Sequence, residues 1–294
     1  MKVSVVCAVY NGGEYLRPFL DSCISQNMDD IEFVCVDDGS TDGSSEILAE
    51  YAEKDSRIKA IFNEHYGVGH TVETGVNAAC GDYIMFVDDD DVIMPNAIER
   101  LYAATEGVAD VVKGTALSEV DGKIIQSNAF VSREPLNWRE FNCDMLALHF
   151  LQPPEMWTYL FKREILPLIT GGDYMFGDTD KVFRAKVVAK DFRYIPEPVY
   201  MWRVHESVSH SDRFPFDLVK AYDNLEHWLK ENNINLWTIF GLSKFYAYQW
   251  NLGRLTGETR DKFAEIMRRD FRRELIDPNI LSPENRIALE LILS

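Results

Sequence analysis

The sequence predicts an α/β protein with a mostly parallel central sheet flanked by helices, and a C-terminal helical extension. Three observations lead to this prediction. Nearly continuous apolar runs recur through the first hundred residues, stretches with helical spacing separate them, and the pattern is helical throughout after about residue 216. Continuous apolar runs are typical of parallel strands buried on both faces. Their alternation with helices indicates a parallel sheet.

Repeated strand and helix units are expected in the first hundred residues. Apolar runs predict strands at residues 3–9, 31–36, 58–62 and 83–87. Between the first two runs, helical i, i+3/i+4 spacing is shown by the apolar residues at 15, 16, 19, 20, 23 and 24. A further helix is expected around 47–51, with candidate N-terminal caps at Ser40, Thr41 and Asp42.

The rest of the chain changes from strands to helices. Two strands, 110–120 and 123–130, flank the hairpin signal Asp121-Gly122. They are followed by a helix at 137–150, a helix at 178–190 and a strand at 194–204. The extension is expected to form helices at 218–229, 236–252 and 258–276.

Composition excludes some classes of protein. The 294 residues are enough for one large domain, alone or with an extension. With 30 basic and 48 acidic side chains, the net charge of −18 argues against a nucleic-acid partner. The five cysteines show no CxxC spacing, which favours reduced thiols and a cytoplasmic location. No run approaches the roughly 18 apolar residues of a membrane span, and the start lacks a signal-peptide pattern.

Four consecutive aspartates follow the predicted strand at 83–87, in the stretch IMFVDDDDVIMP. Ligands of open α/β sheets bind at the carboxyl ends of the strands. Alternate residues of a strand share a face, so Asp88 and Asp90 should point together. Two carboxylates aimed at one point suit Mg²⁺ or Mn²⁺, and such a cation commonly also binds substrate phosphates. The alternative is a solvated acidic loop that caps the next helix.

A second acidic strand end occurs in FVCVDDGSTDGS, where Asp37 and Asp38 precede Gly39. Neighbouring strand–helix units would place this end beside the same crevice, where a carboxylate can accept a hydrogen bond from a base or a sugar. For Asp37 the better interpretation is a cap of the following turn.

These motifs, in this order, resemble those of the inverting family-2 glycosyltransferases of the GT-A fold. VSVVCAVYN, VCVDDGSTDGS and IMFVDDDDVIMP are the first three, and the pattern D-x-D-D with a later Pro is matched by Asp88, Asp90, Asp91 and Pro95. Three later segments are similar as well: WTYLFKR at 157–163, TDKVF at 179–183 and YMWRVHESVSHS at 200–211. The resemblance covers roughly residues 1–212.

The resemblance implies roles for individual residues. The nucleotide-binding set would be Val9, Tyr10, Asn11, Asp38, Asp88 and Asp89, with Asp38 accepting from the uracil ring and Asp88 near the ribose. Asp90 would bind the metal, Mn²⁺ or Mg²⁺. A loop closing over the diphosphate would contain Arg203, His205, Ser207 and Ser209. His205 is also a second candidate metal ligand, against the alternative of solvent exposure.

Two carboxylates compete for the role of catalytic base. Asp178 and Asp180 begin a predicted helix, where one of them can serve as the cap. Residues two apart do not share a helical face, so only one can easily point into the crevice. The family pattern places the base three residues before Phe183, which favours Asp180. Gly177 favours Asp178 instead, because the family often has Gly before its acidic pair.

The implied protein is a metal-dependent inverting glycosyltransferase. It would move a sugar from a nucleotide-diphosphate donor, with UDP as the expected nucleotide, to a saccharide or lipid-linked acceptor in cell-surface polysaccharide or glycolipid synthesis. The GT-A domain would span 1–212, with a nucleotide half at 1–105 and an acceptor half at 106–212, and the extension 213–294. The alternatives are a sugar-nucleotide nucleotidyltransferase and an inactive nucleotide-sugar-binding module.

Some features depart from the family pattern or extend beyond it. The stretch at 71–75 lacks the usual arginine of A-R-N-x-G, and Thr179 replaces the common Glu before the base. These departures put donor-phosphate contacts in question and point to an unusual donor or acceptor. In the extension, basic residues cluster at Arg268, Arg269, Arg272 and Arg273. This cluster suggests a peripheral contact with the inner face of a membrane, against the alternative of a packed helix with solvated arginines.

Overall fold

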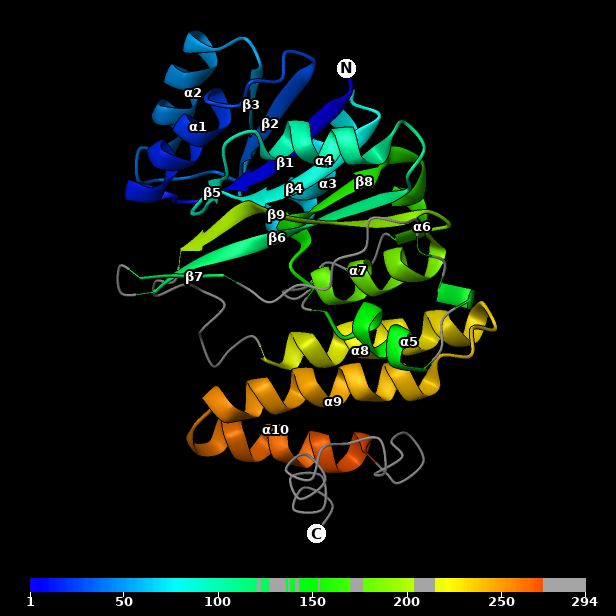
Figure 1. Ribbon diagram of the computed structural model, residues 1–294. Coiled ribbons are helices and arrows are strands. Elements are labelled where there is room, and N and C mark those ends of the chain that lie inside the picture. Colours follow the sequence, from blue (N-terminus) through cyan, green and yellow to red (C-terminus); the bar gives the residue numbers. More distant parts are fainter. Residues whose placement is uncertain are drawn as a thin grey trace. The chain divides into compact units, whose positions relative to one another are not determined.

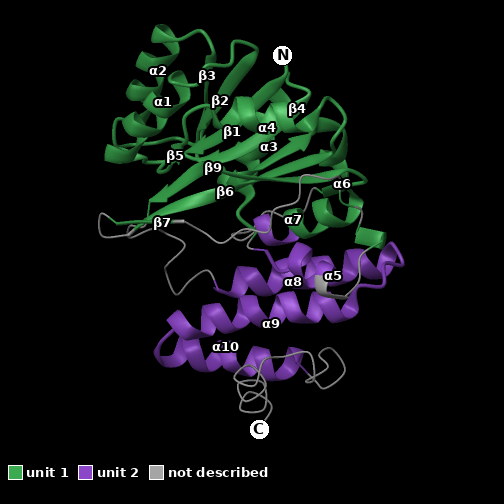
Figure 2. Ribbon diagram, in the orientation of Figure 1, with its two compact units in different colours: residues 1–140, 153–173, 181–205 green, residues 141–152, 174–180, 206–294 purple. Residues whose placement is uncertain are grey.

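The computed structural model describes residues 1–120, 123–126, 136, 138–140, 143–152, 154–169, 177–203 and 215–271 (Figure 1). The chain divides into two compact units (Figure 2). The first comprises residues 1–140, 153–173 and 181–205, and the second comprises 141–152, 174–180 and 206–294. The domain boundary predicted near residue 212 stays a prediction.

One sheet forms the frame of the first unit, with the strand order β3-β2-β1-β4-β8-β6-β9-β5 and β7 paired to β6. Its strands are β1 (Val3–Val9), β2 (Ile31–Asp37), β3 (Ile58–Phe62), β4 (Tyr83–Asp88), β5 (Val92–Ile93), β6 (Val111–Val120), β7 (Lys123–Gln126), β8 (Tyr159–Lys162) and β9 (Phe192–Arg203). The pairs β1–β2, β2–β3 and β1–β4 are parallel, as the apolar runs predict. β8 runs antiparallel to both β4 and β6.

Apolar cores form on both faces of this sheet. On one face pack helices α1 (Leu16–Ile24), α2 (Ser44–Lys54) and α4 (Ala97–Thr105). On the other face pack α3 (Val68–Ala78), α6 (Leu166–Ile169) and residues 181–188 of α7 (Gly177–Val188). Alternate residues of β1 serve the two cores, because Val5 and Cys7 face the first and Val6 the second. A β carbon at Gly75 of α3 would lie only 2.5 Å from Val6 Cγ1, so this close packing requires glycine.

The strand order reverses between β1 and β4. β1 lies beside β2 on one side and β4 on the other, and all three strands point the same way. In open α/β sheets such a switch point leaves a crevice outside the carboxyl ends of the strands. The loops after β1, β2 and β4 therefore meet at this edge.

Some sequence predictions need correction in detail. The hairpin is confirmed by the antiparallel pairing of β6 and β7, whose last pair is Val120 and Lys123, while its turn at 121–122 lies outside the described residues. The helix predicted at 137–150 is shorter, since α5 runs Cys143–Phe150 and Trp138–Glu140 form a separate 3₁₀ turn. Trp138 anchors that turn, because its Nε1 donates a hydrogen bond to Val187 O at 2.8 Å.

The second unit contains the helices of the predicted extension. They are α8 (Pro215–Glu231), α9 (Trp237–Arg254) and α10 (Gly257–Asp270), joined in this unit by α5. Their core is rich in aromatic rings in mutual contact, including Tyr222, Phe240, Tyr248, Phe263 and Phe271. α10 ends where Phe271 N–H donates to Met267 O. Among the described helices, none has the length and apolar character needed to cross a membrane.

Candidate active site

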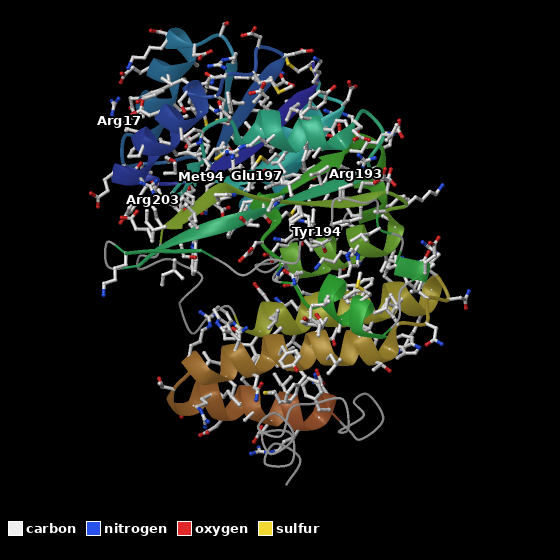
Figure 3. All side chains as sticks on the ribbon, viewed as in Figure 1. Arg17, Met94, Arg193, Tyr194, Glu197 and Arg203 are labelled. Carbon is white, nitrogen blue, oxygen red and sulfur yellow. The ribbon has the colours of Figure 1, made fainter. Side chains whose placement is uncertain are left out.

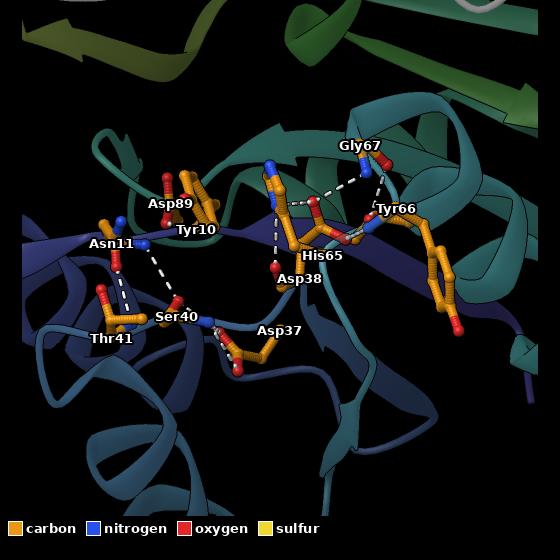
Figure 4. Close-up of polar contacts among 11 residues, drawn as sticks. Tyr10, Asn11, Asp37, Asp38, Ser40, Thr41, His65, Tyr66, Gly67 and Asp89 are labelled. Atoms are coloured by element: carbon orange, nitrogen blue, oxygen red, sulfur yellow. Dashed lines mark hydrogen bonds and ion pairs between the residues drawn. The ribbon is translucent and has the colours of Figure 1, made fainter.

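The loops after β1 and β2 are tied to each other by hydrogen bonds (Figure 4). Asn11 N–H donates to Ser40 Oγ at 2.9 Å, and Thr41 N–H donates to Asn11 Oδ1 at 2.8 Å. Gly13 N–H donates to Asp42 Oδ2 at 3.0 Å. Asn11 adopts a left-handed φ of 52°, which Asn tolerates better than most residues. The two strand ends therefore form one connected edge.

Asp37 and Asp38 have different partners. Asp37 accepts hydrogen bonds from the hydroxyl groups of Ser40 and of Ser45, the latter at 2.7 Å, and so it fixes the turn into α2, as the sequence indicated. Asp38 reaches the loop before α3. Its Oδ1 accepts from Tyr66 N–H at 2.9 Å, and its Oδ2 accepts from Gly67 N–H at 3.0 Å. Both carboxylates are almost fully buried.

Aromatic rings are exposed beside these loops. Tyr10 follows β1 and is 48% exposed. The ring of His65, from the loop after β3, stacks on it with centroids 4.4 Å apart and an interplanar angle of 23°. His65 Nδ1 lies 2.9 Å from Asp38 Oδ2. Flat aromatic rings presented to solvent at a sheet edge are suited to contact a flat ligand.

The third loop carries the aspartate cluster. One carboxylate oxygen from each of Asp88, Asp90 and Asp91 can be chosen so that all lie within 4.8 Å of one another. Asp89 turns toward β1, where its Oδ2 accepts from Tyr10 N–H at 3.3 Å. Space beside it is limited, because a β carbon at Gly12 would lie 2.8 Å from the same Asp89 oxygen. The predicted cluster at the end of β4 is therefore present, and it comprises three of the four aspartates.

Asp91 is the buried member of the cluster. Its Oδ1 accepts from Arg203 N–H at 2.8 Å, whereas its buried Oδ2 has no hydrogen-bond partner among the described residues. Burial, reinforced by the charges of Asp88 and Asp90, raises the pKa of Asp91 to about 8. Burial and the same two neighbours also raise the pKa of Asp89 to about 8. Carboxylates in this state are short of positive charge.

This shortage fits a divalent cation. Mg²⁺ and Mn²⁺ prefer carboxylate oxygens, and the three side chains offer such oxygens close together. The buried oxygen without a donor is the kind of atom a cation would satisfy. The residues present therefore suit the metal that the sequence predicts, with Asp91 as an additional candidate ligand.

Arg203 ends β9 and lies against this loop (Figure 3). Its Nη2 donates to Tyr15 O at 3.2 Å and to Asp91 O at 3.1 Å, and its guanidinium lies 5.0 Å from the centre of the Tyr15 ring. Arg203 thus binds the aspartate loop in this structure. The other predicted residues of the closing loop, His205, Ser207 and Ser209, lie outside the described residues.

Asp88 contacts an aromatic pair formed by Tyr200 and Trp157. Asp88 N–H donates to the buried Tyr200 hydroxyl at 3.0 Å. Trp157 stacks on Tyr200 with centroids 4.5 Å apart. Sequence reasoning did not assign these roles to Tyr200 and Trp157, nor a role to His65. The motifs at 157–163 and 200–211 contained the first two, but the hydrogen bond joins Asp88 to Tyr200 across 112 positions of the chain.

Both candidate bases lie in the first turn of α7, within the second unit. Asp180 is fully buried, and Asp178 is partly buried. Asp178 Oδ1 accepts from Thr179 N–H at 2.8 Å. An acidic side chain is favoured at such a helix start by the exposed amide groups. The choice between them stays a prediction.

Comparisons with known proteins agree with the class that the fold and the acidic strand ends define. The fold is the GT-A fold of glycosyltransferases: the chain superposes on a crystal structure of S. aureus TarS in complex with UDP-GlcNAc with a TM-score of 0.74 and 17% identity, covering 100% of this chain and 87% of that one. Mannosyltransferase PcManGT from Pyrobaculum calidifontis, in complex with GDP-Man and Mn²⁺, gives a TM-score of 0.54 and 15% identity over 99% of this chain and 84% of that one.

The family follows from sequence. The family model described as "Glycosyl transferase family 2" matches residues 4–151. The EpsH protein of Bacillus subtilis, whose name is that of a glycosyltransferase, is 30% identical over 250 residues, which cover 79% of this chain and 70% of EpsH. The chain belongs to glycosyl transferase family 2, and it is a glycosyltransferase.

Proposed function

We propose that this glycosyltransferase moves a sugar, with inversion at the anomeric carbon, from a UDP-sugar to a hydroxyl group of a saccharide or lipid-linked acceptor. The observation that carries the proposal is the carboxylate cluster of Asp88, Asp90 and Asp91 at the carboxyl end of β4. A divalent cation would supply the positive charge that this edge of the sheet lacks, and it would also bind the phosphates of a nucleoside diphosphate. The proposed setting is the synthesis of cell-surface polysaccharide or glycolipid.

Asp90 is the proposed main ligand of Mn²⁺ or Mg²⁺, with oxygens of Asp88 and Asp91 beside it. When bound, the cation would act as a Lewis acid on the leaving diphosphate. Asp91 also fixes the end of β9 through Arg203 N–H. The complex of PcManGT with GDP-Man and Mn²⁺ supports this assignment by analogy of fold. His205 remains a second proposed ligand.

The nucleotide is proposed to bind at the edge formed by the loops after β1, β2 and β4. Its proposed residues are Val9, Tyr10, Asn11, Asp38, Asp88 and Asp89. The hydrogen bonds among these loops hold the edge in shape before a ligand arrives. Such preorganisation lowers the entropy cost of binding. The TarS complex with UDP-GlcNAc supports the choice of a UDP-sugar.

Asp180 is proposed as the general base, with Asp178 as the alternative. The base takes the proton of the acceptor hydroxyl while the hydroxyl oxygen forms a bond to the anomeric carbon. The bond from that carbon to the diphosphate oxygen breaks on the opposite side, and one such displacement inverts the configuration. Arg203, His205, Ser207 and Ser209 are proposed to bind the diphosphate side. The extension at 213–294 is proposed to shape the acceptor side or to contact a membrane.

Calorimetry of UDP binding tests this proposal. Wild type should bind UDP in Mn²⁺ and lose at least about tenfold in affinity in chelator, because the cation links the carboxylates to the phosphates. Asp90→Asn should bind UDP equally weakly in both conditions. Glu53→Gln removes one exposed carboxylate of α2 and serves as the control with wild-type behaviour. Equal UDP affinity of wild type with Mn²⁺ and with chelator would refute the metal role.

A further inference from the structure

His65 is oriented by two oxygens of Asp38, a hydrogen-bonded backbone oxygen and a nearby carboxylate oxygen. Its Nδ1 lies 2.9 Å from Asp38 Oδ2 and 3.1 Å from Asp38 O. Neither oxygen can donate a hydrogen, so the hydrogen of this contact belongs to Nδ1. In the neutral ring, the other nitrogen, Nε2, then carries a lone pair. Figure 4 shows this second nitrogen directed away from Asp38.

The ring of His65 is presented to solvent. Its side chain is 59% exposed, and Tyr10 supports one of its faces through the stacked contact at 4.4 Å. His65 follows β3 and Tyr10 follows β1, so both belong to the edge where the nucleotide is proposed to bind. The exposed Nε2 is therefore an acceptor at fixed orientation beside an aromatic surface.

Asp38 has little capacity left for a ligand. Its side chain is only 4% exposed. Its two oxygens each accept a backbone hydrogen bond, Oδ1 from Tyr66 N–H and Oδ2 from Gly67 N–H, and His65 Nδ1 lies 2.9 Å from Oδ2. The carboxylate is therefore enclosed by groups of the protein. Asp38 is thus suited to contribute to nucleotide binding by positioning His65 and the start of α3.

We infer that Nε2 of His65 reads the nucleobase of the donor by accepting its ring N–H, with Asp38 as the positioning residue. Uracil, thymine and guanine carry a hydrogen on the ring nitrogen of their pairing edge. Cytosine and adenine carry a lone pair at that nitrogen, and two facing acceptors repel each other. The site would thus select UDP-, dTDP- or GDP-sugars against CDP- and ADP-sugars. This inference rests on the proposed nucleotide site and assigns the residue that would distinguish its bases, with the proposed UDP-sugar among the donors accepted.

The experiment compares nucleotides that differ at this ring nitrogen. Binding of UDP, CDP, GDP and ADP is measured by calorimetry in Mn²⁺ at pH 8. Wild type should prefer UDP over CDP, or GDP over ADP, by about tenfold or more, because an unpaired acceptor is costly in a partly buried contact. His65→Phe keeps a flat ring for Tyr10 but has no nitrogen, so the preference should shrink to less than about threefold.

Two further variants separate the base contact from structural effects. His65→Asn can retain the hydrogen bond to Asp38 without an acceptor at the Nε2 position, so it should lose the preference as His65→Phe does. His70→Phe changes an exposed histidine of α3 in the same region and should behave as wild type. Retention of the wild-type preference by His65→Phe overturns the inference and leaves the proposed function intact. Absence of binding of all four nucleotides to wild type overturns both.

Discussion

The ends of β2 and β4 contain the same kind of side chain in opposite electrostatic conditions. At β2, Asp37 accepts from two serine hydroxyls, and the Asp38 carboxylate accepts from two backbone amides and lies 2.9 Å from His65 Nδ1. At β4, Asp91 has a buried oxygen without a donor, and its pKa is raised to about 8 by burial and by neighbouring aspartates. The two carboxylates of β2 are thus neutralised by donors of the protein itself, whereas Asp91 keeps one buried oxygen that a proposed cation would satisfy. The hydrogen-bond partners of an acidic strand end, rather than its sequence, distinguish a structural role from a proposed binding role.

The largest expected effect is a difference in sugar-transfer activity between a variant at the end of β4 and a variant at the end of β2. Asp90→Asn should lower sugar transfer by about 10³-fold or more, since the lost cation stabilises the transition state by several kcal/mol. Asp37→Asn should retain transfer to within about tenfold, because its partners are internal. Release of UDP from a UDP-sugar, in the presence of acceptor, measures both. Similar losses for the two variants would remove the distinction between the strand ends.

A second test compares the two carboxylates of α7, Asp178 and Asp180, by their effects on sugar transfer and on stability. Asp180→Asn should lose about 10²- to 10⁴-fold in transfer, as is common for a general base, while its UDP affinity in Mn²⁺ is unchanged. Asp178→Asn should cost roughly 1 kcal/mol of stability as a helix-start residue and keep its turnover. The reverse outcome, with Asp178→Asn inactive and Asp180→Asn active, would exchange their assignments.

Mutation of Asp91 at the end of β4 should stabilise the metal-free protein. At neutral pH, Asp91→Asn should raise the unfolding free energy of the metal-free protein by roughly 2 kcal/mol, because it removes a carboxyl group that must be protonated to be buried beside like charges. A carboxyl group with a raised folded-state pKa binds its proton more tightly when folded, so wild-type stability should fall as pH rises from about 5 to about 8. The gain from Asp91→Asn should grow over this window. Thermal unfolding in chelator measures it, and Mn²⁺ should stabilise wild type only.

The smallest effect is expected at the β2 end. Asp37→Asn should lower the unfolding free energy by about 1 kcal/mol, since a neutral amide replaces a charged acceptor of two hydroxyls. The loss should be the same in Mn²⁺ and in chelator. Denaturant unfolding under both conditions is the measurement. A loss that disappears in Mn²⁺ would show that Asp37 also belongs to the cation site.

Much of the fold could be predicted from sequence because it depends on local patterns. The apolar runs of β1 to β4 and the helical spacing between them determined both the parallel sheet and its acidic edge. The position of Asp88 and Asp90 at a strand end followed from the same runs. What the pattern could not provide was the partner of each oxygen. The contacts of Asp88 with Tyr200 and of Asp91 with Arg203 each join residues 112 positions apart.

The stacking of His65 on Tyr10 escaped prediction for a similar reason. Each residue lies in a short loop without periodicity, and their contact arises only when β1 and β3 take their places in the sheet. The helix predicted at 137–150 was too long because its pattern did not reveal the anchoring of Trp138 to Val187 O. Local sequence patterns therefore predict helices and strands, whereas the contacts between loops at the candidate site have to be read from the structure.

The tight fit between Gly12 and Asp89 has a consequence for engineering the donor preference. Any side chain at position 12 would bring its β carbon within 2.8 Å of Asp89 Oδ2. A substitution at this position would therefore displace the Asp89 side chain from its hydrogen bond with Tyr10 N–H. Position 65 is different, because its side chain projects into solvent from a loop whose backbone is held by Asp38. Directed evolution of nucleotide choice should thus begin at residue 65 and keep residue 12 as glycine.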